Sequence, residues 1–286
     1  MSEEPAPFAV VRPDRRTTPL VLASPHSGTA YDQSFLESTR LPLATLRRSE
    51  DSYVDELFAA APRIGAPLIK ALFPRSYLDV NREPFEFDPG MFEDKVPRYV
   101  NSRSARVRSG LGTIPRIAAN GAEIYRERLG WGEARRRLLR LYLPYHRALR
   151  DLVAAARKDF GYAILLDCHS MPSAAVETIG GRRVDIVLGD CHGSSCAPAI
   201  VDLAEAVLRR QGYLTTRNRP YAGGFTTQRH GRPLEGVHAL QIEINREIYM
   251  NEERLLRRPT LAAVAADMTR LIVDLSAVEP IPLAAE

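Results

Sequence analysis

The sequence has little of what marks secreted, membrane-spanning or nucleic-acid-binding proteins. Its 286 residues include only three cysteines, an odd number without a Cys-x-x-Cys pair, so neither a disulfide framework nor a cysteine-based metal site is expected. No apolar run approaches the ~20 residues that cross a bilayer, and the N-terminus lacks the pattern of a signal peptide. A net charge of +4 is too small over this length to favour nucleic acid. We therefore expect a cytoplasmic protein with reduced thiols and a small-molecule ligand.

The signature of serine hydrolases is also missing. Ser27 and Ser170 each follow a histidine, but neither lies in a Gly-x-Ser-x-Gly turn. Hydrophobic residues make up 45% of the chain and charged residues 26%, a balance that lets a chain of this length bury a sizeable core. We predict one catalytic domain over residues 1–286. A proline- and glycine-containing excursion at about 83–132 lacks regular periodicity, and a stretch this long suggests a function such as a lid.

Apolar runs and helical patterns alternate along the chain. Alternation of this kind predicts an α/β fold with a mixed, largely parallel central sheet flanked by helices. The arginine run 135–137 falls in a helical pattern and is interpreted as a solvated helix face, and Pro144 should kink or split that helix. Strands are predicted at 19–23, 66–73, 75–81, 162–167, 184–188, 213–216 and 237–244, helices at 52–61, 133–159, 197–210 and 256–276, and a loop at 218–236.

Two histidines stand at equivalent places in this pattern. His26 and His169 each come directly after a predicted buried strand, and ligands of such sheets bind beyond the carboxyl ends of the strands. A catalytic zinc ion usually takes three protein ligands from histidine and carboxylate. We expect the third to be Asp51, with neighbouring Glu50 as a rival. Asp79 or Asp167 could orient a ligating histidine, since such histidines commonly donate their other nitrogen to an acid.

Further polar residues suggest the rest of a hydrolase site. If the segment 75–81 is extended, Arg75, Asp79 and Asn81 point the same way. Strand alternation at 240–245 places Glu243 on the face opposite the apolar residues, and an acid is costly to bury unless it is paired or functional. A glutamate beside a zinc-bound water would be the natural general base. The loop 221–227 offers backbone donors and hydroxyls.

These motifs, taken in order, resemble those of the N-formylglutamate amidohydrolases. The similarity runs from about residue 20 to residue 250, and its order and coverage are more specific than any one motif. The matching segments are Ser24-Pro25-His26-Ser27-Gly28, Asp51-Ser52-Tyr53-Val54-Asp55-Glu56-Leu57, Asp79-Val80-Asn81-Arg82, Pro144-Tyr145-His146, Asp167-Cys168-His169-Ser170-Met171, Asp185-Ile186-Val187-Leu188-Gly189-Asp190, Pro220-Tyr221-Ala222-Gly223-Gly224 and Gln241-Ile242-Glu243-Ile244-Asn245-Arg246.

The resemblance implies a fold like that of the zinc carboxypeptidases and one catalytic zinc ion. It implies that Arg75 polarises the substrate carbonyl and that Asn81 and Arg82 bind a substrate carboxylate. The implied reaction converts N-formyl-L-glutamate and water to L-glutamate and formate, at the end of a branch of histidine degradation. One departure is the absence of the close His-x-x-Glu zinc pair of carboxypeptidases, which leaves the carboxylate ligand open. The full set of expected site residues is His26, Asp51 and His169 for metal, Glu243 and Arg75 for catalysis, and Asn81, Arg82, Gly223, Gly224 and Thr226 for substrate.

Three other functions stay open at this point. The same machinery could cleave another N-acyl amino acid or a small peptide, which a substrate panel would reveal. A serine hydrolase would be insensitive to chelators. A non-catalytic binding protein would keep its ligand affinity after Glu243→Gln and would have no turnover to lose.

Overall fold

The structure, a computed structural model, describes residues 6–119 and 121–279. The chain divides into two compact units. Unit 1 comprises Met1–Ala9, Pro25–Ser52 and Lys70–Ala148, and unit 2 comprises Val10–Ser24, Tyr53–Ile69 and Leu149–Glu286. The expectation of one catalytic domain over residues 1–286 stays a prediction, and each unit is described by itself.

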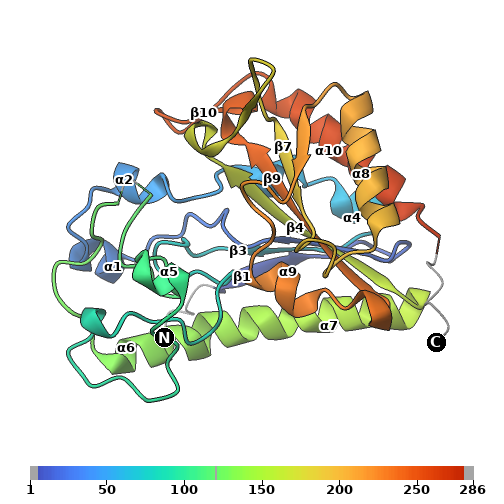
Figure 1. Cartoon of the computed structure of the whole chain (residues 1–286). Coiled ribbons are helices and arrows are strands. Elements are labelled where there is room, and N and C mark those ends of the chain that lie inside the picture. The colour runs from blue at the N-terminus through green and yellow to red at the C-terminus, as the bar shows by residue number, and fades with distance from the viewer. Residues whose placement is uncertain (1–5, 120, 280–286) are drawn as a thin grey trace. The chain divides into compact units, whose positions relative to one another are not determined.

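A seven-stranded sheet has the strand order β1-β3-β2-β4-β9-β7-β8. β2 pairs with β4, β4 with β9 and β7 with β8 in parallel, whereas β7 and β9 are antiparallel. The prediction of a mixed, largely parallel sheet flanked by helices is therefore confirmed (Figure 1). The strands are β1 (Phe8–Val11), β2 (Leu20–Ser24), β3 (Leu68–Ala71), β4 (Ala163–Met171), β7 (Ile186–Gly189), β8 (Thr215–Arg217) and β9 (Val237–Asn245).

The core of unit 2 lies on one face of this sheet. Alternate residues of β4 and β9 pack there, among them Leu166 and Ile242, because side chains on a strand alternate between faces. Helix α8 (Pro198–Arg210) begins with a proline at its first turn, and α10 (Leu261–Ser276) buries a stripe at helical spacing. The short helices α3 (Val54–Leu57) and α4 (Ala61–Ile64) pack against α10 on this face.

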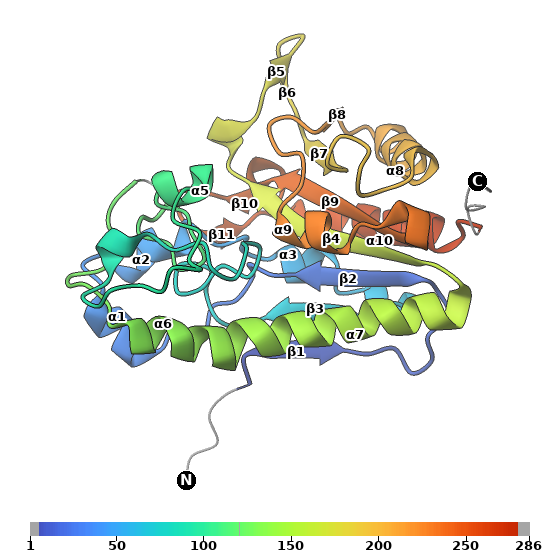
Figure 2. The same ribbon diagram turned by 60° about the horizontal axis from the view of Figure 1, so that its bottom comes forward.

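The opposite face of β4 and β9 carries a group of buried polar residues. It carries Asp167 and His169 from β4 and Gln241 and Glu243 from β9, all buried. Helix α9 (Phe225–His230) packs against both strands, on the side of the sheet away from α8 and α10 (Figures 1 and 2). The structure corrects two expectations here. β4 continues through His169 instead of ending before it, and the expected loop at 218–236 contains α9.

Unit 1 is mostly irregular. Helix α1 (Gln33–Ser38) begins where the Asp32 side chain accepts the backbone N–H of Ser34, and α5 (Ala105–Arg108) begins where Ser104 caps Val107. The described residues of the excursion at 83–132 lie largely in loops, with an antiparallel bridge between Ile117 and Glu123. The remaining elements of unit 1 before its long helix are α2 (Leu43–Arg47) and the 3-10 turn η1 (Pro89–Met91).

The helix predicted at 133–159 is present and is irregular ahead of Pro144. It runs as α6 (Trp131–Arg137), a π-helical stretch η2 (Leu138–Tyr142) and α7 (Leu143–Phe160), the last of which begins in unit 1 and ends in unit 2. Proline has no backbone N–H to donate to the turn before it, and a π-helical turn is one way for a helix to absorb that loss. The expected disturbance therefore appears as a widened turn within a continuous helical stretch.

Other sequence-based boundaries were wrong. Residues 75–82 form turns instead of a strand, so the predicted alternation of their side chains does not apply. The helix expected from residue 52 to 61 is two short helices, α3 and α4, and the first begins only at Val54 because Tyr53 adopts a left-handed conformation with φ 66°. The last helix begins at Leu261 instead of 256. The smaller elements of unit 2 are η3 (Ser173–Ala175), β5 (Thr178–Ile179), β6 (Arg182–Arg183), η4 (Pro233–Glu235), η5 (Arg246–Ile248), β10 (Met250–Asn251) and β11 (Leu256–Arg257).

The hairpin of β5 and β6 extends away from the sheet of unit 2 (Figure 2).

Among the described residues, no helix combines the length and the apolar character that crossing a membrane requires.

Candidate active site

His26 lies in a tight turn two residues after β2 and is almost completely buried. Gly28 makes this turn possible, because a Cβ atom at that position would overlap the main-chain oxygen of Phe73. The backbone N–H of Asp51 donates to the His26 carbonyl at 3.0 Å, and the Ser27 hydroxyl donates to the Asp51 carbonyl at 3.2 Å. The main chain therefore holds His26 and Asp51 side by side although 25 positions separate them.

The two side chains face each other at a distance that suits two ligands of one metal ion. His26 Nδ1 lies 3.2 Å from Asp51 Oδ2, and both residues are 1% exposed. Two ligand atoms about 2.05 Å from a tetrahedral zinc ion would be separated by roughly 3.3 Å. The pair therefore fits two adjacent ligands of one ion as well as it fits a direct hydrogen bond.

Glu50, the rival ligand, is buried but already engaged. Its carboxylate accepts hydrogen bonds from the Tyr31 hydroxyl at 2.8 Å, from Arg47 Nε at 3.2 Å and from the Ser52 hydroxyl at 2.8 Å. Burial and the neighbouring Glu50 charge raise the pKa of Tyr31. These contacts give Glu50 a structural place beside the Asp51 turn and leave Asp51 as the acid that faces His26.

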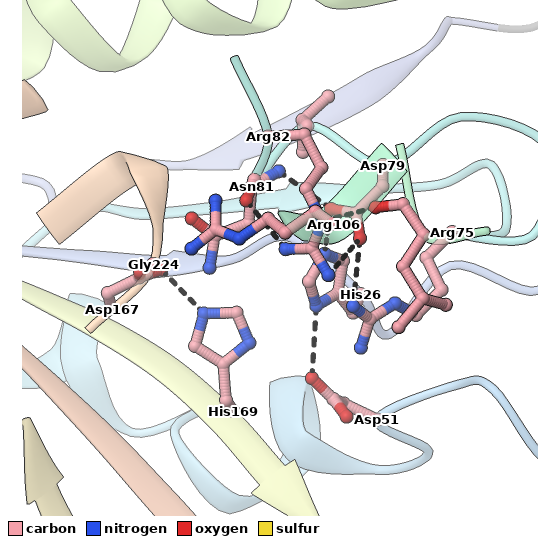
Figure 3. Close-up of polar contacts among 12 residues, drawn as sticks. His26, Asp51, Arg75, Asp79, Asn81, Arg82, Arg106, Asp167, His169 and Gly224 are labelled. Carbon is pink, nitrogen blue, oxygen red and sulfur yellow. Dashed lines mark hydrogen bonds and ion pairs between the residues drawn. The ribbon is translucent and has the colours of Figure 1, made fainter. Parts of the chain in front are cut away.

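Asp79 holds the other nitrogen of His26. Its Oδ1 lies 2.7 Å from His26 Nε2 and accepts the backbone N–H of Asn81 at 2.8 Å, while its Oδ2 accepts from Arg75 at 2.8 Å (Figure 3). Burial by itself would raise the pKa of Asp79, but the charges of Arg82, His26 and Arg75 hold that pKa well below its usual range. An ionised Asp79 orients the His26 ring so that Nδ1 points at Asp51. Asp79 is thus placed where it could orient a histidine, as the sequence suggested.

The guanidinium group of Arg82 makes several contacts within the protein. Its Nε donates to the Leu111 carbonyl at 2.8 Å, its Nη1 donates to the Asn81 carbonyl at 2.8 Å, and its Nη2 lies 3.4 Å from Asp79 Oδ2. Burial lowers the pKa of Arg82, and the charge of Asp79 opposes that shift. Each of the three guanidinium nitrogens therefore has a protein contact, and these contacts fix the turn that carries Asn81.

Arg106 is a cation of this cluster that the sequence did not reveal. It lies on α5 in unit 1, and its charge contributes to lowering the pKa of Arg82 (Figure 3). Its ion pair with Glu86 is long, 4.0 Å, and its side chain is 34% exposed. A four-residue helix within an irregular excursion has no periodicity that could have predicted this placement.

In unit 2, His169 and Asp167 share one face of β4. His169 Nε2 lies 3.0 Å from Asp167 Oδ1, and Asp167 Oδ2 accepts the Thr227 hydroxyl at 3.2 Å. Both members of the pair are buried. Asp167 therefore stands where it can orient His169, as the residue spacing suggested.

Glu243 lies on β9 directly opposite His169 in the parallel register. It is 7% exposed, and its Oε1 accepts from Gln241 Nε2 at 2.9 Å. The backbone N–H of Gly224, at the start of α9, donates to Gln241 Oε1 at 2.6 Å. Thr226 lies in the same helix and is buried. Strand alternation predicted the face of Glu243, but the part played by Gln241 became visible only in the structure.

His26 and Asp51 in unit 1 and His169 in unit 2 are all buried, and each carries a side chain that can bind a metal ion. The donor set fits zinc, which binds imidazole nitrogen and carboxylate oxygen and keeps an open position at catalytic sites. Whether Arg75, Asn81, Arg82, Gly223, Gly224, Thr226 and Glu243 act in binding or catalysis stays a prediction.

Comparison with known proteins identifies relatives along most of the chain. The family model described as N-formylglutamate amidohydrolase matches residues 18–250. A protein named N-formylglutamate deformylase from Pseudomonas aeruginosa is 31% identical over 246 residues, which cover 84% of this chain and 85% of that protein. Its namesake from Pseudomonas putida is 29% identical over 237 residues, 82% of each chain.

One solved structure agrees with this grouping, and a more distant one shares the fold. The crystal structure of N-formylglutamate amidohydrolase from Ralstonia eutropha is 38% identical, has a TM-score of 0.89, and matches across 95% of this chain and 97% of that chain. A gene product from Agrobacterium tumefaciens is 19% identical with a TM-score of 0.63 and covers 94% of this chain and 93% of its own, a likeness that concerns the fold alone.

Proposed function

The chain belongs to the N-formylglutamate amidohydrolase family, whose named relatives are amide hydrolases, and we propose that it converts N-formyl-L-glutamate and water to L-glutamate and formate. The observation that carries this proposal is the buried pair of His26 and Asp51 with Asp79 behind it. That arrangement presents one imidazole nitrogen and one carboxylate to a metal ion and holds the second imidazole nitrogen on an acid. The products would place the reaction at the end of a branch of histidine degradation, in the cytoplasm.

We propose that His169 is the third metal ligand. Within unit 2, β2 and β4 are parallel neighbours with Ala23 opposite Asp167. His26 follows Ala23 by three positions and His169 follows Asp167 by two, so both lie toward the same end of their strands. Adjacent strands are ~4.8 Å apart and three residues reach at most ~11 Å. The parallel register of β2 and β4 supports the proposal that both histidines bind one ion.

A zinc ion held at this site would supply Lewis-acid activation of a water molecule and of the substrate carbonyl. We propose that Glu243 accepts the proton of that water and delivers it to the leaving amine, since an acid on the His169 face of the sheet suits this transfer. Arg75 would stabilise the negative charge that develops on the carbonyl oxygen.

The charges of unit 1 suit an anionic substrate. Arg75, Arg82 and Arg106 outnumber by one the acids they contact, Asp79 and Glu86. This excess of positive charge favours an acidic N-acyl amino acid, and guanidinium groups bind carboxylates with defined geometry. We propose that Arg82 binds a carboxylate of such a substrate.

The neighbouring backbone and the loop of unit 2 complete the proposed substrate contacts. Asn81 lies beside Arg82 and would orient the same carboxylate. Because the Gly224 N–H is taken by Gln241, its loop would contact the substrate through Gly223 and the Thr226 hydroxyl.

Metal analysis joined to a substrate panel tests the proposal. We expect the purified protein to hold one zinc ion and to prefer N-formylglutamate over N-acetyl, N-succinyl and dipeptide analogues. Asp51→Asn should lose the metal, whereas Glu50→Gln should keep it. Glu243→Gln should keep the metal and lose turnover by about 100-fold or more. Full activity after complete metal removal, or full turnover by Glu243→Gln, would contradict the mechanism.

A further inference from the structure

Gln241 connects the proposed base to the loop that precedes α9. Its side chain lies on β9 and is 3% exposed. The Oε1 atom accepts the Gly224 N–H at 2.6 Å and the Nε2 atom donates to Glu243 Oε1 at 2.9 Å. A backbone N–H can only donate, so the Gly224 contact fixes which end of the amide faces Glu243. The hydrogen-bond chain therefore has a single direction, from the loop to the carboxylate.

The loop is held firmly from its other side. The backbone N–H of Cys191 donates to the Ala222 carbonyl at 2.7 Å. A Cβ atom at Gly189 would come within 2.8 Å of the Ala222 main chain, and a Cβ atom at Gly223 would come within 2.6 Å of Cys191 Sγ. The absence of both side chains lets the loop pack directly against the end of β7. A small displacement of Gly224 thus has little room to be absorbed on that side.

We propose that Gln241 is a positioning residue that couples the Gly223–Gly224 loop to Glu243. The proposal rests on the proposed function, because Glu243 must be the base for its position to affect turnover. The packed loop fixes the Gly224 N–H, the N–H fixes the Gln241 amide, and the amide holds one carboxylate oxygen of Glu243. The other oxygen is thereby aimed for proton transfer. Gln241 would act on the chemical step and leave substrate affinity nearly unchanged.

Two substitutions separate the two ends of this connection. Gln241→Met keeps the approximate length and removes both hydrogen bonds. Gln241→Glu keeps an acceptor for Gly224 but replaces the donor to Glu243 with a like charge. Gln228→Met, on the exposed side of α9, is the matched control. We expect both Gln241 variants to lose kcat by about 10- to 100-fold with KM changed less than twofold, because small misplacement of a reacting group has effects of this size. The control should match the wild type in both constants.

Hydrogen exchange of the Gly224 amide tests the coupling without turnover. This amide should be protected in the wild type and in Gln241→Glu and should exchange faster in Gln241→Met. Glu243→Gln should change its exchange rate in the wild-type background but not in the Gln241→Met background. Loss of kcat together with this dependence supports the proposal. Unchanged kcat in Gln241→Met, or an equal effect of Glu243→Gln in both backgrounds, would overturn it. If the wild type fails to cleave N-formylglutamate, the proposed function fails while the exchange result still decides the coupling.

Discussion

Removal of the Asp79 charge is the sharpest test of how His26 is held. Asp79 is 2% exposed and contacts His26 and two arginines, Arg75 at 2.8 Å and Arg82 at 3.4 Å. Asp79→Asn keeps the shape and the acceptor for the Asn81 N–H but leaves the arginines without their counter-charge. Loss of one partner from a buried ion pair typically costs about 3–5 kcal/mol. Because Arg75 remains 23% exposed and water can solvate it, we expect the lower end, about 3 kcal/mol in the free energy of unfolding.

The same substitution should weaken metal binding. Residues that orient a ligating histidine typically contribute about 10- to 100-fold to metal affinity or activity. Denaturant unfolding of the metal-free protein gives the stability change, and calorimetric titration with zinc gives the affinity. Asp151→Asn is the control, because it removes the same charge from an exposed pair with Arg150 whose contribution should be below about 1 kcal/mol.

The pH dependence of the stability difference follows from the lowered pKa of Asp79. A carboxyl group whose pKa is lower in the folded than in the unfolded chain stabilises the fold fully above the unfolded value, and this contribution is lost as the pH falls toward the folded value. The gap between wild type and Asp79→Asn should therefore be full at neutral pH and should shrink below its ordinary pKa of 3.8. A variant within 0.5 kcal/mol of the wild type at pH 7 (about the effect of an ordinary surface substitution), or with unchanged zinc affinity, would refute the reasoning.

The remaining predictions concern packing in unit 1. Gly28→Ala should destabilise the protein and abolish metal binding, because the new Cβ would overlap main-chain atoms at the His26 turn, whereas Gly132→Ala, in α6 with open space around it, should be neutral or slightly stabilising in thermal unfolding. Arg137→Ala should lower the free energy of unfolding by about 2–4 kcal/mol, because its guanidinium is buried 3.7 Å from the centroid of the Tyr77 ring. Arg135, which is exposed in the same helix, provides the comparison. An Arg135→Ala variant as unstable as Arg137→Ala would contradict the stabilising role of the buried Arg137.

The position of Arg137 corrects the sequence-based interpretation of the arginine run 135–137. A helical pattern with three consecutive arginines was interpreted as a solvated face, and Arg135 and Arg136 are indeed exposed. Arg137 is 3% exposed and donates to the Tyr77 carbonyl and the Tyr125 hydroxyl at 2.8 and 2.7 Å. Its aromatic partners are contributed by distant segments, so composition and periodicity could not distinguish it from its neighbours.

The local sequence pattern was enough to predict the central strands, whose burial follows from their own apolar residues. The apolar runs at 162–167 and 237–244 predicted β4 and β9, and alternation placed Glu243 away from the apolar face. Short runs of this kind, bounded by loop signals, are typical of strands buried in a sheet, so they indicate the fold class before any long-range contact is known. The motifs around His26, Asp51 and His169 also sufficed to suggest the family and the metal-ligand candidates.

Only the tertiary structure decided how the polar residues are used. Residues 75–82 contain the alternation of a strand, yet they form turns, in which Asp79 contacts His26, 53 positions away. Glu50 and Asp51 are chemically alike and adjacent, and only their three-dimensional partners separate a structural acid from the one that faces the histidine. A buried polar group takes whichever partner the fold brings within hydrogen-bond distance, and that choice depends on contacts that no short stretch of sequence contains.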